Sequence, residues 1–127
     1  MKIYVHSRRF FRESRETQKT ILDAMHSLYD RIRDYEKAGT AFEQIFNDDK
    51  VKYDQQGQFF VYKSARGNLQ LRILYAYFAE GVLLIEDVFI KKKNNKEYLR
   101  QFEYAKDLDS VKCLQQAQLV ESEGENG

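Results

Sequence analysis

The chain has 127 residues, of which 43% are hydrophobic and 32% are charged, a size and composition typical of one globular domain. This composition excludes a disordered, collagen-like or mucin-like chain over most of the length. The net charge of +1 hides an uneven distribution: residues 60–106 hold nine Lys and Arg against five Asp and Glu, whereas residues 107–127 hold one against five.

The N-terminal part of the chain predicts a strand followed by a long helix. Residues 2–6 alternate weakly in polarity, as in a short strand. From about Glu13 to Lys37, apolar residues recur at alternating spacings of four and three, the pattern of an amphipathic helix. These apolar positions are Ile21, Met25, Leu28, Ile32 and Tyr35. Residues 38–40 favour the end of that helix, and residues 41–58 predict an irregular or briefly helical connection.

Three segments rich in β-branched and aromatic residues follow, at residues 59–63, 69–78 and 82–90. The breaks between them are short and contain Gly67 and Gly81, so the segments predict an antiparallel meander. The middle segment is apolar on both faces, which is typical of a central strand.

The register of the second hairpin determines which residue lies opposite Arg72, and the sequence leaves two registers open. A two-residue turn puts Arg72 opposite Phe89 and on the face of Asp87. A three-residue turn puts it opposite Val88 and on the face of Glu86.

The C-terminal part predicts a helix from about Asn95 to Lys106 and a further short turn that Ser110 caps. Residues 121–127 have no apolar side chain to bury, so we expect a mobile acidic tail after a single domain at residues 1–120. The predicted fold class is α+β: an N-terminal helix or helical hairpin packed on a three- to four-stranded antiparallel meander, with a C-terminal helix.

The meander gathers basic residues at one end of the sheet, because the hairpin at Gly81 puts the start of one strand beside the end of the next. We expect seven cations to share this rim: Lys63, Arg66, Arg72, Lys91, Lys92, Lys93 and Lys96. Such a surface is typical of proteins that bind the phosphates of nucleic acids. Arg72 is the most informative member, because its strand is otherwise apolar at its centre.

Parts of this rim also have a plainer explanation. Lys91 to Lys93 can be a solvated run that guards a strand end, and Arg72 can extend its head to water or pair with Glu86 or Asp87. We favour this explanation for the lysine run alone and nucleic-acid binding for the rim as a whole.

We expect neither a metal nor a cofactor. His6 and His26 stand apart, no cluster has metal-ligand spacing, and the phosphate-loop and dinucleotide motifs are absent. The paired acids are expected to be exposed: Asp48, Asp49, Glu86 and Asp87. Cys113, the only cysteine, is expected to be an ordinary small side chain, and a lone thiol suits the reducing cytoplasm. No apolar segment is long enough for a membrane span, so we expect no membrane association.

One stretch of sequence resembles a known family. It comprises LRILYAYF at residues 71–78, the Gly81 turn, VLLI at 82–85 and VFIKKK at 88–93, followed by a helix containing Ala105. This order, roughly Arg-x-x-Tyr-Tyr/Phe, a Gly turn, a hydrophobic strand and Phe-x-Lys-Lys, is similar to the phage-related, HigB-type branch of the RelE/ParE toxin superfamily. The resemblance covers about residues 58–107.

The resemblance implies the toxin of a type II toxin–antitoxin pair, a metal-independent, ribosome-dependent endoribonuclease that cleaves mRNA and is neutralised by a protein antitoxin. Arg72 matches the family's strand arginine, which implies that it stabilises charge on the reacting phosphate. Lys91 and Lys92 match the Phe-x-Lys-Lys segment, which implies a role at the phosphate and leaving group. Lys63 stands where the family more often has Glu-Leu-Arg. Tyr98 and Lys92 are the candidates for a general base.

Two other functions stay open. A ParE-like toxin would poison DNA gyrase and leave mRNA intact. A non-enzymatic basic module would bind nucleic acid or a protein partner without toxicity. For the favoured function, the expected partners are a cognate antitoxin and mRNA on the ribosome.

Overall fold

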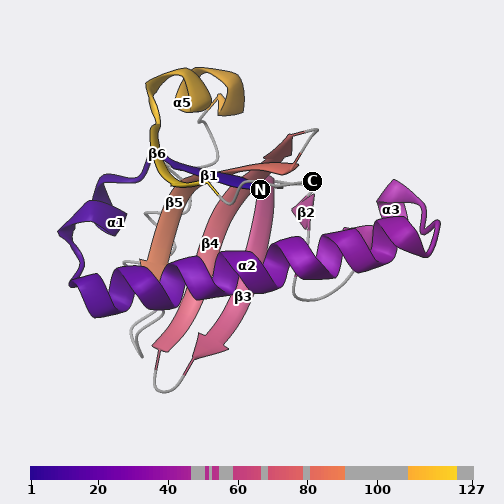
Figure 1. Cartoon of the computed structure of the whole chain (residues 1–127), viewed down its shortest axis with the longest axis horizontal. Helices are drawn as coiled ribbons and strands as arrows, with labels where there is room; N and C mark the ends of the chain where they lie inside the picture. The colour runs from indigo at the N-terminus through magenta and orange to yellow at the C-terminus, as the bar shows by residue number, and fades with distance from the viewer. Residues whose placement is uncertain are drawn as a thin grey trace.

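The computed structural model describes residues 1–46, 51, 53–54, 59–66, 69–78, 81–90 and 109–122. Its elements in chain order are β1 (Lys2–Val5), α1 (Arg8–Arg12), α2 (Arg15–Lys37), α3 (Phe42–Ile45), β2 (Tyr53–Asp54), β3 (Phe59–Arg66), β4 (Leu69–Phe78), β5 (Val82–Ile90), α5 (Ser110–Gln116) and β6 (Gln118–Ser122). Helix α2 lies across a mostly antiparallel sheet, and the short helix α5 comes between β5 and β6 in sequence (Figure 1). The predicted α+β class is therefore confirmed.

The sheet has six strands in the order β2-β3-β4-β5-β1-β6, more than the three or four that the sequence predicts. Strands β3, β4 and β5 form the predicted antiparallel meander. Strand β1 pairs in parallel with β5, from Lys2 opposite Val82 to Val5 opposite Ile85. Strand β6 then pairs antiparallel with β1, so the N-terminal strand lies inside the sheet.

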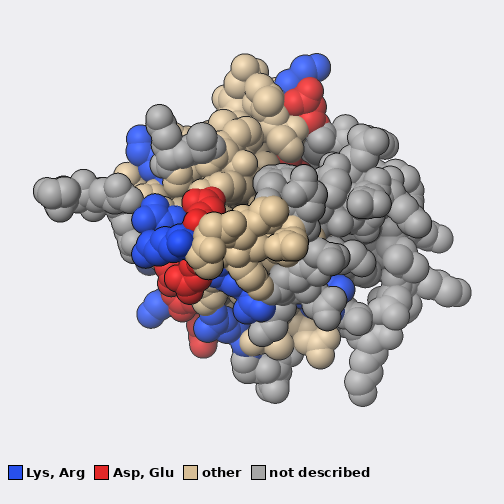
Figure 2. Space-filling view, turned by 90° about the vertical axis from the view of Figure 1, so that its right-hand side faces the viewer, with Lys and Arg blue, Asp and Glu red and all other residues tan. Residues whose placement is uncertain are grey.

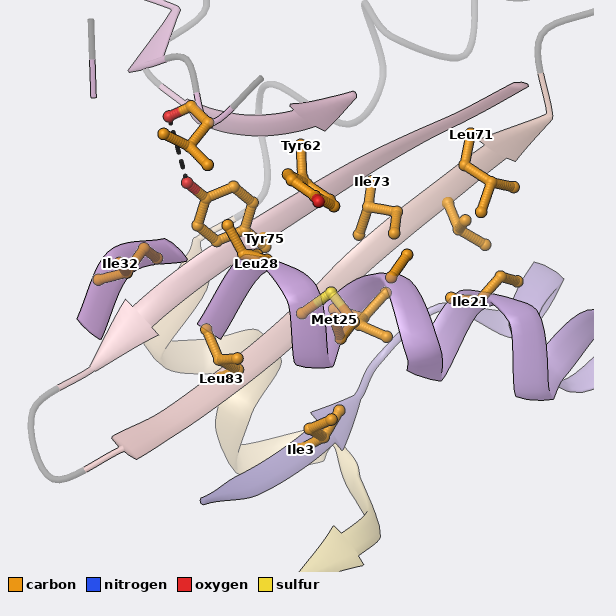
Figure 3. Packing of buried hydrophobic residues seen from close by; sticks show 14 of the residues in the cluster. Ile3, Ile21, Met25, Leu28, Ile32, Tyr62, Leu71, Ile73, Tyr75 and Leu83 are labelled. Atoms are coloured by element: carbon orange, nitrogen blue, oxygen red, sulfur yellow. Dashed lines mark hydrogen bonds between the residues drawn. The ribbon is translucent and has the colours of Figure 1, made fainter. Parts of the chain in front are cut away.

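Helix α2 presents to the sheet the apolar face that its periodicity predicts. Its buried residues are Ile21, Ala24, Met25, Leu28 and Ile32. They form one core with sheet residues that include Ile73 and Leu83 (Figure 3). In this core, the Tyr75 hydroxyl donates a hydrogen bond to the Val51 carbonyl oxygen at 3.3 Å.

The N-terminal helical region consists of two helices, because two serines each cap one. The Ser7 hydroxyl accepts a hydrogen bond from the backbone N–H of Phe10 at 3.3 Å and starts α1. The Ser14 hydroxyl accepts one from the backbone N–H of Thr17 at 3.1 Å and starts α2 at Arg15.

Helix α5 packs on the face of the sheet opposite α2, and we call this face the outer face. Its Cys113 is buried there beside Ala76 and Leu84. The cap of α5 is Asp109, one residue before the predicted Ser110, and its carboxylate accepts the backbone N–H groups of the first turn at 3.0 and 3.2 Å.

Strand β6 includes Glu121 and Ser122, two residues that the sequence assigns to the mobile tail. Both pair with β1, which supplies the backbone hydrogen bonds that an isolated tail lacks. Strand β6 therefore extends two residues past the predicted start of the tail. Residues 123–127 and the helix predicted at residues 95–106 lie outside the described residues. In the part of the chain that is described, no helix is long and apolar enough to cross a membrane.

Candidate functional site

A bulge in β5 sets the geometry of the outer face. The pairs next to the turn follow the register of the three-residue turn. The register then shifts between Leu74 and Tyr75, which leaves Glu86 as an extra residue of β5. Beyond this bulge Arg72 lies opposite Phe89, as the two-residue turn predicts. Each of the two alternatives therefore holds for one half of the hairpin.

The bulge brings two adjacent carboxylates, Glu86 and Asp87, to one cleft of the outer face. The two residues are only 3% and 8% exposed. The expectation of exposed acids is therefore wrong for this pair, because packing of α1 and α5 against β5 covers them. Buried carboxylates need hydrogen-bond or charged partners, and both have them.

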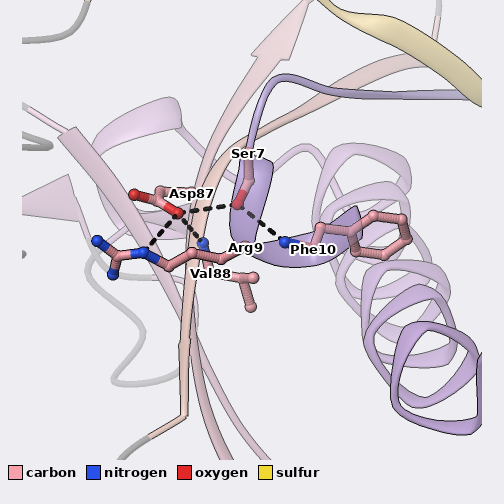
Figure 4. A network of polar contacts seen from close by, with 5 residues as sticks. All are labelled: Ser7, Arg9, Phe10, Asp87 and Val88. Carbon is pink, nitrogen blue, oxygen red and sulfur yellow. Dashed lines mark hydrogen bonds and ion pairs between the residues drawn. The ribbon is translucent and has the colours of Figure 1, made fainter. Parts of the chain in front are cut away.

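Asp87 holds the start of α1 on the sheet (Figure 4). Its Oδ1 accepts hydrogen bonds from the Ser7 hydroxyl and from the backbone N–H of Val88, both at 2.9 Å. Arg9 Nε forms an ion pair with the same oxygen at 4.0 Å. Ser7, already the cap of α1, thereby links the helix start to the buried carboxylate.

Arg9 extends from Asp87 along β5. Its guanidinium carbon lies 4.9 Å from the centre of the Phe89 ring, a cation–π contact. Its Nη1 atom is buried and has no hydrogen-bond partner among the described residues. One arginine therefore touches two side chains of the outer face and keeps an unused donor.

Glu86 faces α5. The Ser110 hydroxyl donates a hydrogen bond to Glu86 Oε1. Burial raises the pKa of Glu86 above its ordinary value, and Asp109 adds to this effect, while the Ser110 hydrogen bond and the charge of His6 oppose it. Burial, together with the negative charges of Glu86 and Asp109, also raises the pKa of Cys113 to about 11, so its thiol stays protonated near neutral pH.

These groups line a cleft of about 680 Å³ between α1, β5 and α5, the α1–α5 cleft. Its lining residues are His6, Ser7, Arg8, Arg9, Arg12, Glu86, Asp87, Asp109, Lys112, Cys113 and Gln116. Cations from both helices thus surround two buried carboxylates. None of these residues is among the sites predicted from the sequence. The sequence signal that could have indicated this cleft is the cluster of three arginines, Arg8, Arg9 and Arg12, within one short segment.

Two of the predicted site residues come together on the outer face. Lys63 of β3 pairs directly with Arg72 of β4, which in turn pairs with Phe89 of β5. Directly paired residues direct their side chains to the same face. With Arg9 over the Phe89 ring, the three cations Lys63, Arg72 and Arg9 form a cation row across the strands. Arg72 Nη1 donates a hydrogen bond to the Leu71 carbonyl oxygen at 3.0 Å.

Arg66 does not join the cation row. It stands three residues from Lys63 on the same strand, so its side chain projects from the opposite face. There its guanidinium donates to the Ser27 hydroxyl on α2. The remaining predicted rim residues lie outside the described residues: Lys91, Lys92, Lys93 and Lys96. On the face shown in Figure 2, Lys and Arg atoms are interspersed with Asp and Glu atoms.

Within the described ranges, no group of three His, Cys, Asp or Glu side chains is placed to hold a metal ion. Comparisons with protein-family models, curated proteins and solved structures find no match. The cation row and the α1–α5 cleft are therefore the features from which a function can be inferred.

Proposed function

We propose that this protein binds RNA through the cation row and is the toxin of a type II toxin–antitoxin pair that cleaves mRNA on the ribosome. The observation that carries the proposal is the strand register, in which Lys63 lies opposite Arg72 and Arg72 lies opposite Phe89 beneath Arg9. The resemblance of residues 58–107 to the RelE/ParE superfamily supports the same function, because Arg72 matches the family's strand arginine.

The cation row has the chemistry of a phosphate-binding surface. Side chains of directly paired residues start about 4.5–5.5 Å apart, so the positive heads follow one another closely across the strands. Lys63 is exposed and Arg72 is half-buried, which leaves their heads open to a ligand while their aliphatic parts lie on the sheet. The hydrogen bond to Leu71 holds the Arg72 head, whose other N–H groups can donate to phosphate oxygens.

In the proposed reaction, the ribose 2′-oxygen attacks the neighbouring phosphate, and the bond from phosphorus to the 5′-oxygen breaks. Negative charge builds up on the phosphate oxygens in the transition state. Arg72 stabilises this charge. Lys91 and Lys92 act on the phosphate and the leaving group, as the family resemblance implies.

The test is induction of the protein in a bacterium, with growth and the 5′ ends of mRNA measured together. We expect the wild type to arrest growth and create new transcript ends. Arg72→Ala should abolish both effects. Lys19→Ala, which removes an exposed cation from α2, should leave them unchanged.

Other outcomes would redirect the proposal. Normal growth and intact transcripts, with folded wild-type protein present, would refute the toxin. If such a protein still bound RNA in a salt-dependent manner, it would be a binding module. A DNA-damage response with intact mRNA would indicate a gyrase poison.

A further inference from the structure

We infer that the α1–α5 cleft is the acid–base centre of this RNA cleavage: His6 accepts the proton of the ribose 2′-hydroxyl, and Glu86 donates a proton to the leaving 5′-oxygen. The inference rests on the proposed function and adds the two proton-transfer groups that the cation row lacks. It also replaces Tyr98 and Lys92, the two candidates for a general base that the sequence offers.

The cleft and the cation row are continuous through Arg9. This residue lines the cleft, forms an ion pair with Asp87 and covers Phe89, which lies opposite Arg72. An RNA strand whose phosphates contact Lys63 and Arg72 therefore reaches the mouth of the cleft at the end of the row.

Arg9 also brings positive charge to the cleft. Its side chain is 35% exposed and lines the cleft. The charge of Arg9 would therefore add to that of Arg72 at the reacting phosphate. Arg8, Arg12 and Lys112 line the same cleft and increase its attraction for RNA.

The parallel pairing of β1 with β5 puts the two proton-transfer groups on adjacent strands. Val5 pairs with Ile85, and the backbone N–H of His6 donates to the Ile85 carbonyl oxygen at 2.9 Å. Val5 and Ile85 form the last pair of the two strands, and His6 and Glu86 are the next residues on β1 and β5. Both side chains line the cleft.

The chemistry of this pair suits two different roles. The unprotonated ring nitrogen of an imidazole can accept a proton and so act as a base. Burial raises the pKa of Glu86, so its carboxyl group keeps a proton to a higher pH than an exposed glutamate does. The other titratable groups of the cleft that face Glu86 are Asp109 and Cys113 of α5 and the neighbouring Asp87.

The proton transfers balance the reaction. The bond from the 2′-oxygen to phosphorus forms while the bond from phosphorus to the 5′-oxygen breaks, and the products are a 2′,3′-cyclic phosphate and a 5′-hydroxyl. His6 becomes protonated and Glu86 becomes ionised. Proton exchange with water restores both groups for the next cycle.

The experiment measures two quantities on the full chain. Cleavage of an end-labelled mRNA is followed on programmed ribosomes as a function of pH, and binding of a short single-stranded RNA is followed by fluorescence anisotropy. The variants are His6→Gln and Glu86→Gln, with Glu16→Gln on the exposed start of α2 as the matched control.

We expect His6→Gln and Glu86→Gln each to slow cleavage about 100-fold or more while RNA affinity is unchanged. In the remaining activity, Glu86→Gln should remove the alkaline limb of the pH–rate profile. Wild-type cleavage in either variant would overturn the inference and leave the proposed function intact. Absence of cleavage by the wild type would overturn both.

A second variant tests the role of Glu86 without replacing the carboxyl group itself. The hydrogen bond from Ser110 lowers the pKa of Glu86, so Ser110→Ala should move the alkaline limb to higher pH. An alkaline limb that stays in place in Ser110→Ala would overturn the assignment of Glu86 as the acid.

Discussion

His26 Nε2 on helix α2 lies 2.7 Å from Glu121 Oε2 on strand β6. The two side chains are 30% and 27% exposed, so the contact is partly shielded from water. It ties the last strand of the sheet to the helix that covers the core. Together with the pairing between β6 and β1, it explains why the sheet includes two residues of an acidic segment.

Loss of this contact should loosen β6 and leave the rest of the sheet unchanged. We expect a double-mutant cycle of His26→Ala and Glu121→Ala to give a coupling of about 0.2–1 kcal/mol, as is usual for partly exposed ion pairs. Amide hydrogen exchange should become faster at Gln118–Ser122 and stay constant in β3 and β4. Unchanged exchange in β6 would show that backbone pairing alone holds this strand.

The meander could be predicted from the sequence because residues close together in the chain determine its strands and turns. Residues 69–78 and 82–90 are β4 and β5 within the bounds expected, since short turns next to apolar runs define hairpins. The parallel pairing of β1 with β5 leaves no local pattern, because its partners are distant in the chain and meet only when the core forms.

Gly81 should resist substitution for two reasons. Its φ of +75° strains any residue with a Cβ, and an added Cβ would lie 3.0 Å from the Tyr29 hydroxyl oxygen. Gly39 has a similar φ of +71° but nothing within 4 Å of such a Cβ, so Gly39→Ala measures the backbone strain alone.

In urea unfolding we expect Gly39→Ala to cost about 1–2 kcal/mol and Gly81→Ala to cost more. Adding Tyr29→Phe to Gly81→Ala should recover the difference between the two glycine variants. The effect of Tyr29→Phe alone must first be subtracted, because the Tyr29 hydroxyl accepts a hydrogen bond from Arg33 at 3.1 Å. Equal losses in the two glycine variants would mean that the Tyr29 contact relaxes without cost.

Under the proposed function, the cation row should control the salt dependence of RNA binding. Each phosphate contact with single-stranded nucleic acid contributes about −0.7 to the slope of log K against log salt. Combining Lys63→Ala with Arg72→Ala should therefore reduce the magnitude of the slope by about 1.4. Lys19→Ala, a cation on the other side of the sheet, should leave it unchanged. A slope that Lys63→Ala and Arg72→Ala do not alter would place RNA elsewhere on the surface.

The sequence predicts half of the candidate site. Lys63 and Arg72 meet because the hairpin that joins them is encoded locally. Strand alternation puts Arg66 on the opposite face from Lys63, so Arg66 lies apart from the cation row. The cleft could not be predicted from the sequence, because the bulge at Glu86 and the approach of Arg9 to β5 depend on tertiary packing.

Tyr77 should titrate unusually late. Burial, followed by the hydrogen bond to Glu36, raises the pKa of Tyr77 from 10.0 to about 12. Because the folded value is the higher one, this group contributes stability below pH 10 that is lost as pH rises toward 12. Absorbance titration should show one phenol that ionises late, absent in Tyr77→Phe and shifted toward the ordinary value in Glu36→Gln. Urea unfolding of Tyr77→Phe should lose the same alkaline dependence.

The two adjacent carboxylates of the bulge should respond oppositely to replacement by amides. Burial raises the pKa of Glu86 above the ordinary 4.5, so ionisation of Glu86 opposes folding. Its contribution to stability is present below pH 4.5 and is lost as pH rises through the folded value. Glu86→Gln has no charge to bury and should gain stability relative to the wild type over this rise in pH.

Asp87→Asn should instead lose stability at neutral pH. The Asp87 carboxylate accepts hydrogen bonds from Ser7 and Val88 and pairs with Arg9, and hydrogen bonds to a charged group contribute about 1.5–3 kcal/mol. Urea unfolding of both variants from pH 4 to pH 8 compares the two effects directly. If Glu86→Gln lost stability at neutral pH as Asp87→Asn does, then the contact with Ser110 would outweigh burial, and Glu86 would be an anchor of α5 that remains ionised.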